Sequence, residues 1–529
     1  MILRNLIRYH TLYKTKIKVT PSYALKNLHH FKGNSIESLY IIVYIDNESL
    51  DDYKELKSND FFHNALHISL GKPLDIGLIY KTVKKVKFSY SFNNDLPKGF
   101  FPSSVESIRF GHSFNKSIGR EVLPDGLVCL KMGHNFSKAF YPNVLPKSLK
   151  KLCIGNSFFH SINNEIYPEG LIHLEVGSNF LQEFTKETIP PQLRVLRSSS
   201  GEVDLFKTMS LDSNIHNLGY FLQELDLFHS LVKCKDYRWL PRNLIKLKLP
   251  SVFSSELTIG ELPETLKSLS LGTFYNTQLL SGCLPNGLKR LDLGLGYNKS
   301  IKDVLPSMLE KLTFPLSSQQ DTGNWISKCK NLKILKLYSS YKDVSIDGIV
   351  PNTVIKLVLE GKIKIERNTI PSSVKELIIK SPVFIKPNTI PDSVTILVLD
   401  WKLLNSKISF PTSIKRLEFC PNILKKNDLP NSIEHLTIST KCEFEQGSIP
   451  SSVKRLVLHY TPKNMDFGLI PSTVKSLKFL YSPDYIYINP DLLYKDLSLD
   501  VQKGFTRGSR CLDDFNTIKK AGVLTNSLK

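Results

Sequence analysis

Several residue patterns that would point to an enzyme, a metalloprotein or a disulfide-rich protein are missing from this chain. Its eight cysteines fall at irregular intervals with no Cys-x-x-Cys pair, which argues against a zinc site of the usual spacing and against a disulfide framework. It also has no His-Glu-x-x-His and no Gly-x-Ser-x-Gly motif. We therefore predict no catalytic residue, no metal site and no cofactor, and a reduced, cytoplasmic compartment.

Long apolar runs are also missing. The most apolar stretch, Leu39–Ile45, is far shorter than the ~18 to 20 residues that a membrane-spanning helix needs.

Acidic residues are absent from the segment 1–36, which could therefore be a mitochondrial-type targeting segment. This stretch has only two arginines and one serine before Gly33, so we favour the other interpretation, a helical N-terminal cap over residues 1–32.

Acidic residues are outnumbered along the whole chain, with 49 Asp and Glu against 70 Lys and Arg, and the formal net charge is +21. An acidic or polyanionic surface is a natural electrostatic partner for such a chain. The basic residues are spread along the sequence instead of forming one block, so solubility is the simpler interpretation of the charge.

The abundant feature of the sequence is one motif, Leu/Ile-Pro followed by apolar residues at positions +3, +6 and +8 counted from the proline. Between residues 101 and 190 this motif recurs every 22 residues, and glycine follows at +9 and an aromatic residue at +12 in four successive copies. Self-similarity at a period of roughly 20 to 50 residues is typical of a solenoid, in which each copy forms one coil. The prolines are Pro102, Pro124, Pro146, Pro168 and Pro190.

Each position of the copy has a physical reason. The Leu/Ile-Pro step predicts a corner, because proline fixes φ and favours an extended residue before it. Apolar residues at +6 and +8 alternate with outward residues at +5 and +7, as in a strand with one buried face. The small residue at +2 suits a turn, the glycine at +9 lets the chain leave the strand, and the aromatic at +12 is expected to fill the core. One copy buries too little apolar surface to offset its ordering entropy, so the copies must stack.

The stretch Gly111-His-Ser-Phe-Asn-Lys-Ser-Ile118, followed by Leu123-Pro124, resembles the FNIP repeat, a relative of the leucine-rich repeat. The resemblance covers roughly residues 33–481 and implies a repeat-built binding scaffold without catalytic machinery. The fold class predicted is a mainly β, leucine-rich-repeat-like solenoid with parallel strands on its concave face. Copies with and without the proline add up to about 21 coils of 19–23 residues.

The period changes at three places. Leu196 and Leu225, both at +6 of their copies, stand at an offset of 29. This predicts an insertion near residues 198–214 that bulges outward, since a buried loop would leave backbone groups unpaired. From Pro351 the copies shorten to 19–21 residues. The period ends at Tyr481, and residues 482–529 are expected to form a C-terminal cap and tail, with a helix over 491–502.

Two groups of outward side chains at +5 and +7 are candidate binding residues. One is a basic ladder near the N-terminal end of the concave face, where stacked cations would focus positive potential. The other is an aliphatic patch in the shortened copies, because exposed apolar residues with a polar rim usually mark a contact site. The ladder consists of Lys85, Lys87, Arg109, Lys131 and Lys151, the patch of Val358, Ile378, Ile396 and Val398, and its rim of Glu360, Glu376, Asp400 and Glu418.

The sequence therefore favours a non-enzymatic scaffold that binds a protein partner through its concave face. The alternative function is binding of a polyanion or nucleic acid by the basic ladder, which would make the affinity fall steeply with salt. Simpler interpretations stay open for both groups. The lysines could serve solubility, and the aliphatic residues could reflect strand propensity or lie under a terminal segment of the chain.

Overall fold

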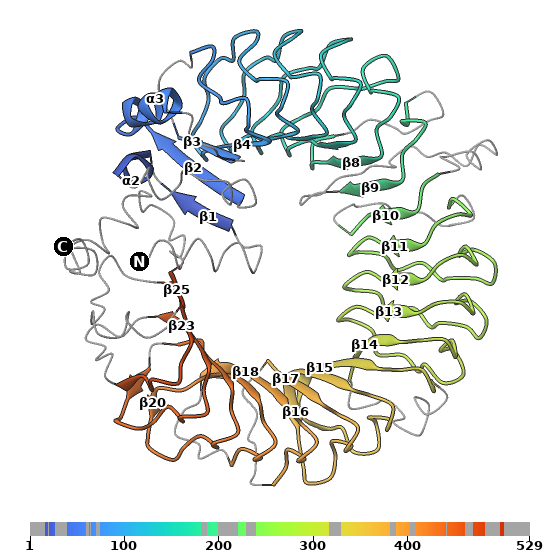
Figure 1. The fold of residues 1–529 in the computed structure, drawn as a ribbon. Helices are drawn as coiled ribbons and strands as arrows, with labels where there is room; N and C mark the ends of the chain where they lie inside the picture. Colours follow the sequence, from blue (N-terminus) through green and yellow to red (C-terminus); the bar gives the residue numbers. More distant parts are fainter. Residues whose placement is uncertain are drawn as a thin grey trace. The chain divides into compact units, whose positions relative to one another are not determined.

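The computed structural model describes residues 16–19, 21–26, 40–59, 63, 65–69, 75–180, 188–198, 221–228, 240–316, 329–380, 388–402, 409–440, 442–460, 469–481 and 498–501. The chain divides into two compact units, Leu3–Leu288 and Lys289–Lys529, here the N-terminal and C-terminal units. In each unit taken alone, strands lie along the inner side of the curve that its coils make (Figure 1). No described helix is long and apolar enough to cross a bilayer.

The described residues of the N-terminal unit include a ladder of 12 strands that pair in chain order and in parallel. Two helices, α2 (Pro21–Lys26) and α3 (Leu50–Ser58), accompany its first strands. The strands are β1 (Lys16–Val19), β2 (Tyr40–Asp46), β3 (Ala65–Ser69), β4 (Lys85–Phe88), β5 (Ser107–Arg109), β6 (Cys129–Lys131), β7 (Lys151–Cys153), β8 (His173–Val176), β9 (Val195–Ser198), β10 (Glu224–Asp226), β11 (Lys246–Lys248) and β12 (Ser268–Ser270).

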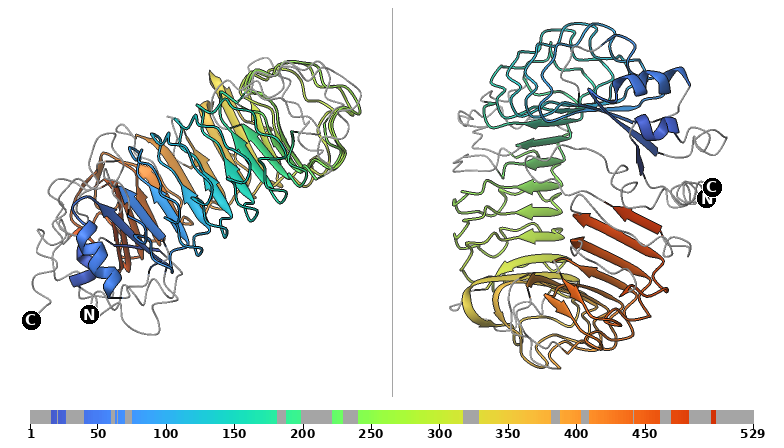
Figure 2. Two further views of the ribbon diagram at one scale, coloured as in Figure 1. Left: turned by 90° about the horizontal axis from the view of Figure 1, so that it is seen from above. Right: turned by 90° about the vertical axis from the view of Figure 1, so that its left-hand side faces the viewer.

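In the part of the C-terminal unit that the structure describes, 11 strands pair in parallel as a second ladder. A two-stranded sheet of β20 (Ile423–Leu424) and β22 (Glu443–Phe444) lies outside this ladder. The ladder strands are β13 (Arg290–Asp292), β14 (Lys311–Pro315), β15 (Ile334–Ser345), β16 (Lys356–Lys364), β17 (Glu376–Ile379), β18 (Ile396–Lys402), β19 (Arg416–Cys420), β21 (His435–Ile438), β23 (Arg455–Tyr460), β24 (Ser476–Tyr481) and β25 (Ser498–Val501). Figure 2 shows the neighbouring arrows of each unit side by side and pointing the same way.

The strand register confirms the period read from the sequence. Ile108 pairs with Leu130, and Leu130 with Leu152, at a sequence offset of 22 in each case, and all three are fully buried. In the shortened copies Leu377 pairs with Leu397 at an offset of 20. Leu225 pairs with Leu196 at an offset of 29, so the extra length leaves the ladder unbroken. The predicted insertion near 198–214 lies, apart from Ser198, outside the described residues.

The aromatic side chains at +12 form the back of the core, as predicted. Phe92, Phe114, Phe136, Phe158 and Phe180 are all at most 2% exposed. Their rings stack from coil to coil with centroids 5.9–6.2 Å apart. Each ring therefore packs on its counterpart in the next coil, and this gives the stack an apolar spine that no single copy could provide.

The glycines at +9 are required for a reason that the sequence did not indicate. A Cβ atom on Gly133 would lie 1.7 Å from the carbonyl oxygen of Gly111, and Gly155 stands in the same relation to Gly133. Neither has a positive φ. Successive coils thus approach so closely at this position that no side chain fits, and the need is for space and not for an unusual backbone angle.

The serines at +2 also act between coils. The hydroxyl of Ser393 donates to the carbonyl oxygen of Val374 at 2.9 Å, and that of Ser413 donates to Val394 at 2.8 Å. The acceptor in each case belongs to the preceding coil. The sequence predicted a role within the turn, whereas the structure gives these hydroxyls a bond that ties neighbouring turns together.

The ladders extend beyond the segment 33–481 at both ends. β1 lies within residues 1–32, where a helical cap was expected, and pairs with β2. β25 lies within 482–529, over residues 498–501 where a helix was expected, and pairs with β24. Residues 16–19 and 498–501 thus form strands where helix was expected, whereas α2 places a helix within residues 1–32.

Candidate binding face

The candidate site is the strand face, defined as the outward side chains at +5 and +7 of each coil. Because the strands pair in register, these side chains form two columns that run across the strands at the inter-strand spacing of about 4.8 Å. Residues about 20 positions apart in the sequence are therefore neighbours on the strand face.

The predicted basic ladder is divided between the two columns of the N-terminal unit. Lys87, Arg109 and Lys131 are register partners on β4, β5 and β6 and form three successive +7 positions. Lys85 and Lys151 belong to the +5 column, where Ser107 and Cys129 separate them. The five side chains thus lie at the expected +5 and +7 positions, as a +7 column of three cations with Lys85 beside it and Lys151 on β7. Their role in binding stays a prediction.

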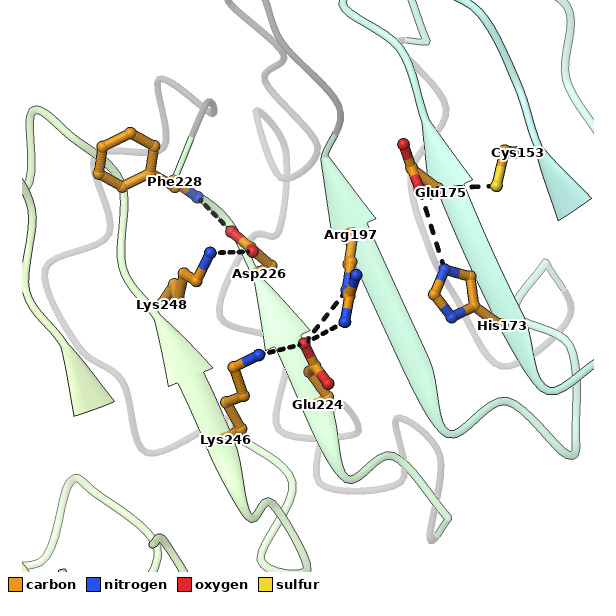
Figure 3. Close-up of polar contacts among 9 residues, drawn as sticks. All are labelled: Cys153, His173, Glu175, Arg197, Glu224, Asp226, Phe228, Lys246 and Lys248. Carbon is orange, nitrogen blue, oxygen red and sulfur yellow. Dashed lines mark hydrogen bonds and ion pairs between the residues drawn. The ribbon is translucent and has the colours of Figure 1, made fainter. Parts of the chain in front are cut away.

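The +7 column continues to Cys153 on β7 and Glu175 on β8. Together with His173, at +5 of β8, they form a cluster of three residues whose side chains can bind a metal ion. Glu175 is the register partner of Cys153, and His173 precedes it by two residues on β8. The Cys153 thiol donates to Oε2 of Glu175 at 3.5 Å, and Nε2 of His173 is 4.0 Å from the same oxygen (Figure 3). Lys131 Nζ lies 4.0 Å from the other oxygen, Oε1.

The electrostatics of this cluster argue against a nucleophilic cysteine. Burial, with the Glu175 charge, raises the pKa of Cys153 to about 12, so the sulfur is a thiol at neutral pH. Oε2 of Glu175 is the acceptor of the thiol proton and also the neighbour of the imidazole, so the thiol is hydrogen-bonded to the carboxylate and not to a general base. Interaction with His173, and also with Lys131 and Cys153, lowers the pKa of Glu175 to about 2 against the opposing effect of burial.

Beyond this cluster the strand face carries ion pairs between coils. Oε1 of Glu224 accepts hydrogen bonds from Arg197 Nη2 at 2.7 Å and from Lys246 Nζ at 2.8 Å. Asp226, in the next column, is paired with Lys248 at 2.7 Å (Figure 3). Charges of both signs therefore alternate here and neutralise one another, in contrast to the all-basic column on β4–β6.

The aliphatic patch lies on the strand face of the C-terminal unit. Val358, Ile378 and Val398 are register partners in the +7 column, and Ile396 is in the +5 column between Glu376 and Arg416. Ile378, Ile396 and Val398 are half-buried. Val358 is only 8% exposed, so the expectation that all four face solvent is wrong for this residue.

Ion pairs flank Val358 on the strand face. Its register partner Lys336 reaches Glu360 at 3.0 Å, and on its other side Lys356 reaches Glu376 at 2.7 Å. Lysine stems cover apolar surface when their ammonium groups are held by acids. In the predicted rim, Glu360 and Glu376 form ion pairs with lysines of the same chain, whereas Asp400 is exposed.

Sequence reasoning missed the Cys153, His173 and Glu175 cluster because the three do not form a linear motif. Aligning the copies by their prolines would have found it, since they occupy +7, +5 and +7 of two successive copies. It could not have given the distances, which depend on side-chain rotamers.

Parallel strands, one per coil, with an apolar core behind them define a leucine-rich-repeat-like solenoid. The family model of the FNIP Repeat matches residues 72–113, 114–157, 236–274, 275–317, 421–461 and 442–482. The chain therefore contains FNIP repeats in these segments, and its fold is that of a leucine-rich-repeat-like solenoid. No curated protein matches it.

Solved structures of leucine-rich-repeat proteins are similar to this chain at low sequence identity. CroV588, described as a novel circular LRR protein, is 24% identical over 84% of this chain and 67% of its own, with a TM-score of 0.45. The LRR protein LIC12759 of Leptospira interrogans is 18% identical over 81% and 93%, with a TM-score of 0.35. YopM from Yersinia enterocolitica is 16% identical over 84% and 87%, with a TM-score of 0.30.

Proposed function

We propose that this protein is a non-enzymatic scaffold that binds a protein partner through its strand face. The observation that carries the proposal is the half-buried aliphatic cluster of Ile378, Ile396 and Val398 on β17 and β18. These side chains lie on the outward face of strands whose inward residues, such as Leu377 and Leu397, already fill the core. Their apolar surface is therefore surplus to folding and suits a contact with another protein.

The surroundings of the cluster favour a partner with an apolar centre. Arg416 is exposed beside Ile396, and Glu418 is half-buried beside Val398. An apolar centre with a polar rim is the usual anatomy of a protein interface, in which few residues supply most of the binding energy. We expect apolar side chains of the partner to contact Ile378 and Val398, with polar groups around them.

The test is the double variant Ile378→Lys, Val398→Lys, used to capture partners from a lysate in parallel with the unaltered chain. Val358 is left intact because its burial would confound binding with folding. A matched control is Ile423→Lys, since Ile423 is 49% exposed on the separate β20–β22 sheet of the same unit. The proposal expects the double variant to lose a partner that the control retains, with equal melting temperatures.

Other results would contradict it. Retention of every captured protein by the double variant would remove the patch as a binding face. A lowered melting temperature in the double variant alone would instead point to a segment of the same chain lying over these residues.

A second function, polyanion binding, is favoured by the column of Lys87, Arg109 and Lys131. Three cations at successive strand positions repeat at about 4.8 Å, and this spacing focuses positive potential toward phosphates or sulfates. Lys85 in the neighbouring column adds to it, whereas Glu175 bounds the basic region on the far side.

The test of this second function is charge reversal at Arg109 and Lys131, with binding to heparin and to RNA measured over a range of salt. The matched control reverses Lys116 and Lys138, which occupy +14 of the same two copies. The hypothesis expects only the first pair to weaken binding and to flatten its salt dependence. Equal losses in both variants would mean a general effect of net charge.

A further inference from the structure

We propose that Cys153, His173 and Glu175 form a zinc-binding site on the strand face of the N-terminal unit. The site would take one Zn²⁺ through the Cys153 sulfur, a nitrogen of His173 and one carboxylate oxygen of Glu175. It is independent of the proposed protein-binding patch, which lies in the C-terminal unit.

The positions of the three ligand atoms fit a small tetrahedral ion. They all lie within 4.8 Å of one another, and the sulfur is 3.5 Å from Oε2 of Glu175. Zinc bonds of about 2.0–2.3 Å place neighbouring tetrahedral ligands about 3.3–3.8 Å apart. Binding therefore needs only a contraction of the longer separations, which side-chain rotation can provide without moving the strands.

The imidazole carries the second, independent observation. Nε2 of His173 is buried, and the polar atom in contact with it, Oε2 of Glu175, lies 4.0 Å away. The two groups influence each other at this distance, but the nitrogen makes no hydrogen bond of normal length among the described residues. A buried polar atom without a partner costs free energy, and a metal ion at this position would satisfy it.

The donor set selects the class of metal. A thiolate with an imidazole and a carboxylate suits Zn²⁺ and similar transition metals, whereas Mg²⁺ and Ca²⁺ prefer oxygen ligands alone. Binding breaks the S–H bond of Cys153, releases that proton to solvent and forms the S–Zn bond. The two negative ligands then neutralise the dication, so the nearby Lys131 and Lys151 face a site without net charge.

Rigid placement supports the site as well. Cys153 and Glu175 are fixed by the register of β7 and β8, and the inward residues Leu152 and Leu174 beside them are fully buried. Three protein ligands leave a fourth tetrahedral position open for water.

The experiment is titration of the purified full-length chain, stripped of metal, with Zn²⁺ against a chromophoric chelator and with Co²⁺ by absorption spectroscopy. We expect one ion per chain, and with Co²⁺ a thiolate-to-metal charge-transfer band. Cys153→Ser should abolish that band, and Glu175→Gln and His173→Gln should each weaken Zn²⁺ binding at least about tenfold. Circular dichroism of the metal-free variants should match that of the unaltered chain.

The matched control is Cys129→Ser, because Cys129 lies on the same face at +5 of β6 but outside the group of three. It should leave the stoichiometry, the affinity and the charge-transfer band unchanged. The proposal would be overturned by a band that survives Cys153→Ser. It would also be overturned if all three ligand variants bound Zn²⁺ as tightly as the unaltered chain does. If Ile378→Lys, Val398→Lys lost its partner but still bound zinc, the result would concern the proposed protein-binding function and would leave the zinc site unaffected.

Discussion

Arg197 on β9 and Glu224 on β10 form an ion pair of 2.7 Å although they stand at a sequence offset of 27. The same oxygen of Glu224 accepts from Lys246 on β11. Partial burial raises the pKa of Glu224, but its hydrogen bonds and charge interactions with Lys246 and Arg197 outweigh that effect, and the net pKa is below the ordinary 4.5. One carboxylate thus joins three successive coils at the place where the period is interrupted.

Glu224→Gln should make stability less dependent on pH in the acidic range. The unfolded state binds a proton at higher pH than the folded state does, so the stabilisation by Glu224 is present above about pH 4.5 and is lost as the pH falls below it. We expect the variant to be less stable by about 1 kcal/mol at pH 7 and the difference to vanish in acid. Thermal melts between pH 7 and pH 3 measure this, and a difference that is constant with pH would contradict it.

Gly133→Ala should destabilise the N-terminal unit. The new Cβ would collide with a backbone oxygen of the preceding coil at 1.7 Å, and relief requires the coils to separate, at a cost of about 1–3 kcal/mol or more. The control is Gly119→Ala, because the nearest atom to a Cβ there is a Val122 methyl at 3.8 Å. Urea denaturation compares the two, and equal midpoints would show that the close approach is not needed.

Ser393→Ala and Ser373→Ala should differ although both serines occupy +2. Ser393 donates to Val374, so its loss should cost about 0.5–1.5 kcal/mol. The Ser373 hydroxyl is buried without a partner among the described residues, so its removal should be neutral or stabilising. The comparison uses melting temperature, and the opposite order would refute the inter-coil role of the hydroxyl.

Leu291→Asp should disrupt neighbouring coils as well as its own. Leu291 is 2% exposed and pairs with Leu312 of the next coil, and an unpaired carboxylate there adds a desolvation cost to the roughly 2–5 kcal/mol lost when a core leucine is truncated. Limited proteolysis should show cleavage spreading into the adjoining copies. Arg290→Asp, on the exposed neighbour, is the control, and cleavage confined to the altered coil would refute coupling between coils.

The segment near residues 198–214 should be the first interior site of proteolysis. It is surplus to the period and rich in serine, and the ladder continues from β9 to β10. Timed digestion with mass mapping of the fragments locates the first cuts. First cuts within residues 241–314, where the period is regular, would contradict this.

The architecture could be predicted from the sequence because it depends on period alone. The spacing between equivalent leucines translates directly into the register, as for Leu196 and Leu225, and the phenylalanines at +12 into an apolar spine. Pairwise side-chain geometry could not be predicted. The burial of Val358 and the distances among Cys153, His173 and Glu175 depend on side-chain rotamers, which the period of the sequence does not specify.

The register stays unbroken where the offset between paired strands is 19, as for Leu417 and Leu436, and where it is 29, as for Leu196 and Leu225. The length of a coil and the content of its strand are therefore separable. Residues can be added to or removed from the outer part of a coil while the strand columns keep their order. Duplication of one copy would insert a single new row into the face and leave every other row intact. Such a chain can acquire new surface chemistry one row at a time, without having to evolve a new core.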